Sequence, residues 1–135
     1  MRVLICGGRR FGIIPPDTRP ENMEEARARA RREQGILAVA LSPYLQDLGA
    51  HTIIHGAARG ADAVAARWAE RHNVPAMAFP ANWKKHGKAA GPRRNAKMIA
   101  EGRPDVVIAF PGGRGTADCV RQARAAGIEV VEVKA

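Results

Sequence analysis

The residues best suited to chemistry stand in a glycine-rich stretch, PGGRGTADC, that directly follows the apolar run DVVIAF. Gly112, Gly113 and Gly115 allow the backbone to come close to a ligand, so that successive N–H groups can point at one anion. Thr116 adds a hydroxyl at the positive end of the helix that we expect to begin there. This stretch therefore predicts a loop that binds phosphate. A glycine turn with Thr116 as an ordinary N-cap would have the same sequence pattern.

A second turn of this kind is HGAARGAD. Gly56 and Gly60 permit a tight turn, and Arg59 supplies a guanidinium fork that suits phosphate. Asp62 lies in the first turn of the helix that follows. It is either a ligand for a ribose hydroxyl or an ordinary acid at a helix start, and the sequence favours neither.

A third candidate segment is NWKKHGKAAGPRRN, which is basic throughout. Trp83 can stack on a base, and the cations around it can meet phosphates or form a solvated loop. The residues that we expect to face a ligand here are Trp83, Lys88, Arg94 and Asn95. No dinucleotide G-x-G-x-x-G motif and no G-x-x-x-x-G-K-[ST] motif accompanies these segments, so neither standard phosphate loop is predicted.

Other kinds of site are not indicated. His51 and His55 lie four residues apart in a predicted strand, where that spacing makes no facing pair, and no carboxylate–histidine cluster occurs. We therefore predict no metal and no resident cofactor. Ser42 is the only serine and lies away from the glycine-rich loops, which excludes a Ser-His-Asp arrangement.

The elements that must position these loops alternate regularly. Strands are expected at 2–8, 51–56, 74–80, 105–110 and 128–133, and helices at 19–41, 61–73, 92–102 and 116–127. Gly35 and Ser42-Pro43 are expected to break the first helix, and Gly49 to end that region. This alternation predicts an α/β, Rossmann-like, doubly wound fold: a mainly parallel five-stranded sheet with helices on both faces. Ligands of such sheets bind at the carboxyl ends of the strands, where Gly7, Gly8 and Arg9 would join the three segments above.

Size and charge place limits on the protein. With 135 residues the chain is expected to form one domain, 1–135. The net charge of +9 favours anionic partners such as nucleotides, nucleic acid or acidic metabolites, although arginines spread over a solvated surface would give the same value. No apolar run reaches membrane-spanning length, and Cys6 and Cys119 form no C-x-x-C pair. We expect a cytoplasmic protein without disulfides.

Taken together, GGRR, HGAARGADAVAARWA, FPANWKKHGKAAGPRRNAKM and AFPGGRGTAD resemble the YspA-type branch of the SLOG superfamily. The resemblance covers most of the chain, except that the segment around residues 11–34 fits less well and is predicted to be an insertion. It implies a Rossmann-like domain that binds a nucleotide or nucleotide-derived ligand, often as a homodimer. The superfamily also includes the Lonely-Guy phosphoribohydrolases and the Smf/DprA proteins, which bind single-stranded DNA.

The phosphoribohydrolases carry P-G-G-x-G-T-x-x-E and R-K-x-x-M motifs. Arg94 and Met98 match the second motif, with Asn95 in place of its lysine. The last Glu of the first motif falls on Cys119, and Asp118 lies one position early, about 100° around a helix. Catalytic residues therefore stay unknown, with Arg94 and Asp118 as candidates. Cys119 is a possible nucleophile near a helix start, but a small packed residue is the commoner role.

These observations favour a protein that binds a nucleotide-derived ligand, as a sensor or by sequestering it. One alternative is hydrolysis of a nucleotide N-glycosidic bond. The other is binding of single-stranded nucleic acid, against which the sequence offers only two Trp, one Tyr and three Phe. The base, the number of phosphates and any cleavage are left open.

Overall fold

The computed structural model describes residues 1–46 and 49–135 of the chain. Its centre is a sheet in which every pair of neighbouring strands is parallel. The strand order is β3-β2-β1-β4-β5, and the strands are β1 (Arg2–Cys6), β2 (Thr52–His55), β3 (Ala76–Ala78), β4 (Val106–Ala109) and β5 (Glu129–Glu132). The predicted α/β, Rossmann-like fold with five strands is confirmed.

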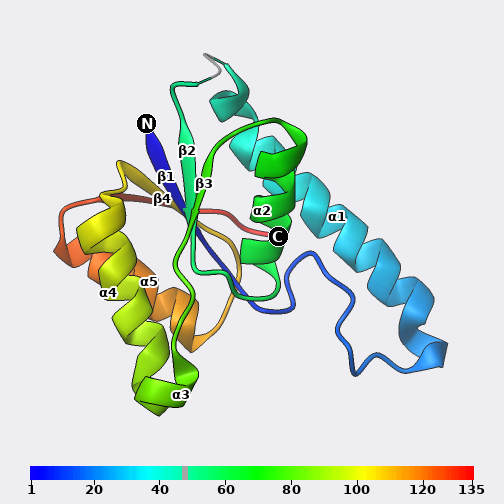
Figure 1. Ribbon diagram of the computed structural model, residues 1–135. Helices are drawn as coiled ribbons and strands as arrows, with labels where there is room; N and C mark the ends of the chain where they lie inside the picture. The colour runs from blue at the N-terminus through cyan, green and yellow to red at the C-terminus, as the bar shows by residue number, and fades with distance from the viewer. Residues whose placement is uncertain (47–48) are drawn as a thin grey trace.

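Helices cover the sheet on both faces (Figure 1). One layer contains α1 (Met23–Leu41) and α2 (Ala61–Arg71), and the other contains α4 (Ala90–Gly102) and α5 (Arg114–Ala125). Because both faces are covered, the central strands are apolar at consecutive positions, as RVLIC and VVIA show.

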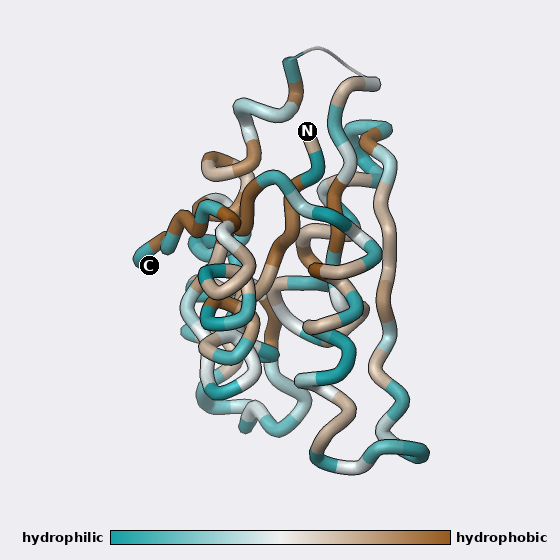
Figure 2. Tube along the Cα trace, turned by 90° about the vertical axis from the view of Figure 1, so that its left-hand side faces the viewer, coloured by the Kyte–Doolittle hydropathy of each residue, from teal (hydrophilic) through white to brown (hydrophobic). Residues whose placement is uncertain are grey.

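Alternate residues of the central strands supply two cores. Val3, Ile5 and Ile53 pack with α1 and α2, whereas Leu4 and Ile54 pack with α4 and α5. Figure 2 shows the hydrophobic stretches of the chain concentrated in the strands at the centre of the molecule. This packing holds the carboxyl ends of β1 and β4 side by side, in the register Cys6 to Ala109.

Helix α1 corrects one prediction, because it runs without a break through Gly35. A glycine in a helix costs about 1 kcal/mol relative to alanine. Here Ala30, Leu37 and Leu41 bury one side of the helix, and that burial outweighs the cost. A 3-10 turn (Ser42–Leu45) follows α1. Residues 47–48, which precede the predicted end of this region at Gly49, lie outside the described part of the chain.

Helix starts also differ from expectation, and α1 itself begins at Met23 after a 3-10 turn (Pro20–Asn22). Helix α4 begins at Ala90, slightly before Pro92, and α5 begins at Arg114, which puts Thr116 inside the first turn and makes Gly113 the N-cap. An unpredicted one-turn helix, α3 (Trp83–His86), precedes α4. The Asn82 side chain accepts a hydrogen bond from the Lys85 N–H at 3.1 Å and so caps α3.

Within residues 1–46 and 49–135, none of the helices combines the length and the apolar character needed to cross a membrane.

Candidate functional site

A cavity of about 920 Å³ lies at the carboxyl ends of the strands. Most of the ligand-binding residues predicted from the sequence line it: Gly7, Gly8, Arg9, Asp62, Trp83, Lys88, Arg94, Asn95, Gly112, Gly113, Gly115 and Thr116. Gly56 and Arg59 line a smaller adjoining cavity of about 290 Å³, which shares Arg9, Ala58, Trp83 and Arg94 with the first. Gly60 lines neither of these two cavities.

The loops after β1 and β4 meet closely. The Gly8 N–H donates to the Pro111 carbonyl at 2.8 Å. A Cβ at Gly8 would stand 2.9 Å from that same oxygen, and one at Gly112 would overlap the Thr116 hydroxyl and lie 2.7 Å from the Gly8 nitrogen. Gly8 and Gly112 are therefore required by the packing of one loop against the other.

Gly113 and Gly115 have a different role, because a Cβ at either position would meet no atom within 4 Å. The α5 N-cap, Gly113, makes no side-chain capping bond, and the first turn contains no acid. The first intrahelical bond runs from the Ala117 N–H to the Gly113 carbonyl at 3.0 Å. The N–H groups of residues 114–116 therefore have no intrahelical partner and are open to an anion.

The start of α2, by contrast, is closed. Gly60 has φ +81°, and a Cβ there would overlap the Gly8 carbonyl oxygen. The Ala61 N–H already donates to that carbonyl at 3.1 Å. Asp62 adds a carboxylate in the first turn. Of the two glycine turns that predicted phosphate binding, the one at α5 is open to an anion, and the one at α2 mainly packs against the β1 loop.

The Asp62 carboxylate holds the loop after β2. One of its oxygens accepts hydrogen bonds from the Gly56 N–H at 3.1 Å and the Ala58 N–H at 3.2 Å. Burial raises the pKa of Asp62 to about 6, and the bond from Ala58, the charge of Arg94 and the bond from Gly56 partly oppose that rise. Asp62 thus combines a loop-holding role with a position on the cavity wall.

Arg94 links that loop to α4. Its Nη1 donates to the Gly56 carbonyl at 2.5 Å, and its Nε donates to Asn95 Oδ1 at 3.0 Å. A Cβ at Gly56 would overlap the Arg94 guanidinium, which explains the glycine there without any turn requirement. Within the described part of the chain, Arg94 Nη2 has no hydrogen-bond partner, and the residue lines both cavities.

Asn95 links α4 to the start of α5. The side chain is 3% exposed, and its Nδ2 donates to the Gly115 carbonyl at 3.2 Å and to Asp118 Oδ2 at 2.9 Å. Because its Oδ1 already accepts from Arg94, the amide has little left for a ligand. Asn95 therefore positions Arg94 and the α5 cradle.

The catalytic candidate Asp118 is heavily hydrogen-bonded. Besides the bond from Asn95, it accepts from Gln122 Nε2 at 2.8 Å and from Arg121 Nη2 at 3.0 Å. Three donors thus bind this carboxylate, although the residue lines the cavity.

Cys119 lies in the core and is 1% exposed. It packs with Leu4 and Cys6 beneath the first turns of α5. The pKa of the Cys6 thiol is raised by its hydrogen bond with Cys119 and by burial. A buried thiol of this kind is a packing group, so the geometry does not support a nucleophilic Cys119.

Arg9 and Trp83 form the aromatic part of the site. The Arg9 guanidinium lies 5.1 Å from the centre of the Trp83 ring, within cation–π range. Trp83 is 48% exposed. A Cβ at Gly91 would stand 3.4 Å from the Trp83 ring, so the ring rests on the start of α4. An exposed indole at the border of both cavities is suited to stack on a planar ring.

The segment predicted as an insertion supplies part of the cavity wall, which the sequence did not indicate. Phe11, Arg29 and Glu33 of this segment line the cavity, together with Arg10 just before it. Arg29 donates to Glu33 at 2.5 Å and to the Ile13 carbonyl at 2.8 Å, which ties α1 to the loop before it. Their contribution depends on the direction of α1 across the strand ends, for which the sequence carries no signal. That the segment is an insertion stays a prediction.

The cavity is electropositive. Seven basic side chains line it against three acidic ones, Glu33, Asp62 and Asp118; the basic residues are Arg9, Arg10, Arg29, Lys88, Arg94, Arg114 and Arg121. Among the residues that the structure describes, no group of three or more His, Cys, Asp or Glu gathers as metal ligands would.

Two comparisons connect the chain with known proteins. Residues 1–86 match the family described as YspA, cpYpsA-related SLOG family. The chain is 48% identical over 86 residues to the Gene 61 protein of Mycobacterium phage D29, which covers 58% of this chain and 68% of that protein. No solved structure matches.

The family match spans β1 to α3 and includes Gly7–Arg9, Gly56–Asp62 and Trp83, whereas the α4 and α5 contributions lie beyond it. Since the match covers well over half of the 135 residues, the chain belongs to the YspA, cpYpsA-related SLOG family.

Proposed function

We propose that this domain binds a nucleotide-derived ligand in the cavity at the carboxyl ends of the strands and acts by sensing or sequestering it. The observation that carries the proposal is the open start of α5. Its unpartnered N–H groups face an electropositive cavity in which Gly113 and Gly115 leave room for an anion.

Under this proposal, different parts of the cavity hold the phosphate, the base and the ribose of the ligand. The phosphate lies against the backbone of residues 113–116, where the helix dipole and Arg114 favour negative charge. The base stacks on Trp83 beside Arg9. Arg94 lines both cavities, and its Nη2 is available to a phosphate or a ribose.

The same geometry gives little support to N-glycosidic hydrolysis. Position 119, where the related hydrolases carry Glu, is buried in the core, and the nearby Asp118 already accepts three hydrogen bonds. Three of the roughly four acceptor sites of that carboxylate are therefore taken, which leaves Asp118 little capacity to accept a proton from a substrate. Binding is therefore the favoured function.

Thermal denaturation with and without ligand tests the proposal. Nucleoside mono- and diphosphates and ADP-ribose are compared with the uncharged nucleosides. A phosphorylated ligand at a hundred times its dissociation constant should add about 2.7 kcal/mol to the free energy of unfolding. The nucleosides should add much less, because they lack the group that the α5 cradle holds. Absence of any shift across the whole panel contradicts the proposal.

The variant Gly113→Val should abolish the ligand-induced shift, since its side chain enters the open space of the cradle. Gly35→Ala is the matched control: Gly35 is also free of contacts within 4 Å, but it lies in α1 and does not line the cavity. It should leave ligand binding unchanged. The homodimer and the cytoplasmic location implied above stay predictions.

A further inference from the structure

Basic side chains gather on one flank of the cavity, along α3 and the first half of α4. The sequence contains no Asp or Glu between Glu70 and Glu101. Within the described residues, one ion pair is formed by these cations, from Lys97 to Glu101 at 3.9 Å. The exposed cations, called the basic ridge below, are Lys84, Lys85, Lys88, Arg93 and Lys97.

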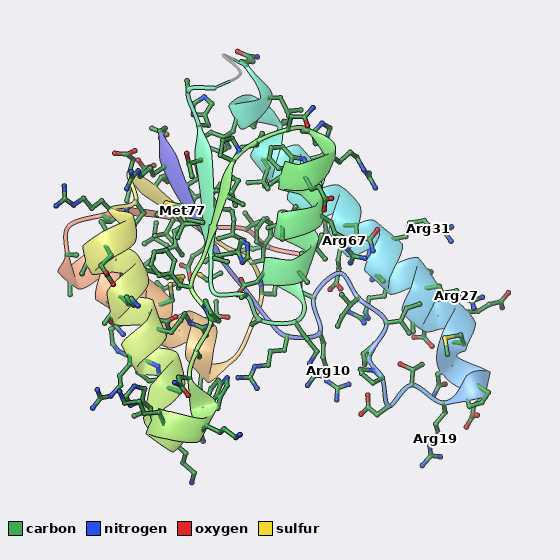
Figure 3. The ribbon with its side chains drawn as sticks, viewed as in Figure 1. Arg10, Arg19, Arg27, Arg31, Arg67 and Met77 are labelled. Atoms are coloured by element: carbon green, nitrogen blue, oxygen red, sulfur yellow. The ribbon has the colours of Figure 1, made fainter. Side chains whose placement is uncertain are left out.

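The opposite layer of the molecule is different. Exposed arginines also occur there, and Figure 3 shows Arg27 and Arg31 projecting from α1 on the far side of the sheet from α4. Acids are interleaved with them, Glu24 and Glu25 in α1 and Glu70 in α2, so the positive charge of this layer is partly compensated. The larger excess of positive charge therefore lies beside the cavity, where no acid occurs between Glu70 and Glu101.

The basic ridge is continuous with the cavity. Lys88 belongs to both, and Trp83, which lines the cavity, begins the helix that carries Lys84 and Lys85. Arg93 and Lys97 are one helical turn apart on α4 and continue the line of charge away from the cavity mouth. The pKa of His86 is lowered by desolvation and by the positive charges of Arg93 and Lys85, in keeping with a crowded positive surface.

We propose that the ligand is the end of a single-stranded oligonucleotide, with its terminal nucleotide in the cavity and the adjoining phosphates on the basic ridge. This inference rests on the proposed function. A free mononucleotide leaves Lys84, Lys85 and Arg93 of the ridge without an acidic partner, whereas a chain of phosphates neutralises such cations and releases counterions. A single strand is favoured over a duplex because a base must be unpaired to reach Trp83. One exposed tryptophan stacks one base, so the remaining affinity comes from phosphate contacts.

Titration with ligands of increasing length tests the inference. The probes are a nucleoside 5′-monophosphate and 5′-phosphorylated oligonucleotides of two, four and ten residues, with adenine and thymine in parallel. Affinity should rise at least tenfold from the mononucleotide to the tetranucleotide. The slope of log K against log salt should steepen by about 0.7 for each further phosphate bound. A blunt duplex of the same length should bind more weakly than the single strand.

The triple variant K84A/K85A/R93A should lose the gain with length and keep the affinity for the mononucleotide, because none of the three side chains lines the cavity. The control R27A/R31A/R67A removes the same charge from the opposite layer. It should keep the gain in affinity with length and the affinity for the mononucleotide. Equal affinity of the wild type for all lengths, or an equal loss in the control, overturns the inference and leaves the proposed function standing. Failure of the mononucleotides and oligonucleotides alike overturns both.

Discussion

At the scale of single residues, the site depends on side chains whose hydrogen bonds are made within the protein. Asn95 and Asp118 carry the residue types of a catalytic centre, yet their bonds to each other and to Gly115 join α4 to α5. Arg94 is bonded to Gly56 and Asn95 and keeps one nitrogen for a ligand. The residue types of Asn95 and Asp118 alone would therefore lead to an overestimate of their catalytic role, because the hydrogen bonds of buried polar side chains are normally made by neighbouring residues.

Asp62 provides a prediction at this scale. Its folded-state pKa of about 6 lies above its ordinary value of 3.8, so the folded protein binds the proton more tightly than the unfolded chain does. The stability contributed by this group is therefore greatest below pH 4 and declines as the pH rises through about 6, by an amount on the order of 3 kcal/mol. Urea unfolding of wild type and Asp62→Asn from pH 4 to 7.5 measures it: the wild type should lose stability relative to the variant as the pH rises.

Asp17→Asn is a control with the opposite sign. Asp17 is exposed, and its hydrogen bond and ion pair with Arg10 lower its pKa. Any contribution it makes is present above its ordinary pKa and lost as the pH falls. A difference between wild type and Asp62→Asn that does not change with pH would show that the pKa of Asp62 is not raised in the folded state.

At the scale of elements, the starts of the helices decide what each glycine loop does. The α5 start is open because no acid and no neighbouring loop occupies it, whereas the α2 start is filled by the β1 loop and Asp62. The cavity is thus asymmetric, with its anion site on the α4 and α5 side of the sheet.

A pair of glycines tests how element geometry controls stability. Neither Gly35 nor Gly127 would bring a Cβ within 4 Å of another atom, but Gly127 follows α5 with φ +77°, and Gly35 is inside α1. Gly35→Ala should raise the free energy of unfolding by about 1 kcal/mol, because alanine is the better helix former. Gly127→Ala should lower it by roughly 1 kcal/mol, because the left-handed conformation opposes a Cβ. Chemical denaturation compares them; a loss in Gly35→Ala would mean that α1 is strained there.

At the scale of the whole molecule, both cysteines are buried between the sheet and the α4–α5 layer, and Cys6 also lines the cavity. Cys6 is 7% exposed and Cys119 is 1% exposed, and the structure records both as free thiols. The raised pKa of Cys6 further reduces its thiolate fraction. A thiol-specific reagent should therefore modify the native protein slowly, at a rate that follows the unfolded fraction in increasing urea.

The variant Cys6→Ala isolates Cys119 for this measurement. Slow modification that follows unfolding agrees with a packing role. Rapid modification without urea, slowed by a bound nucleotide, would instead show that Cys119 is accessible from the cavity and would support a role as a nucleophile.

The sequence by itself determined the fold class, the family and most of the cavity wall. Alternating apolar strands and helices specify a parallel sheet, and the loops after parallel strands must meet at one edge of it. The sequence alone therefore predicts that Gly8, Trp83 and Gly113 lie close together, and all three line the cavity. Family membership followed from motifs that match over residues 1–86.

Only the tertiary structure decided which of these groups are free to act. Whether a side chain faces a ligand or a neighbour depends on helix rotation and on contacts between distant segments, which local patterns do not encode. That is why Cys119 lies in the core, why Gly56 makes room for Arg94, and why Arg29 and Glu33 of α1 reach the cavity. The open start of α5 also depends on the tertiary structure, because no other segment of the described chain comes within 4 Å of the place where a Cβ of Gly113 or Gly115 would stand.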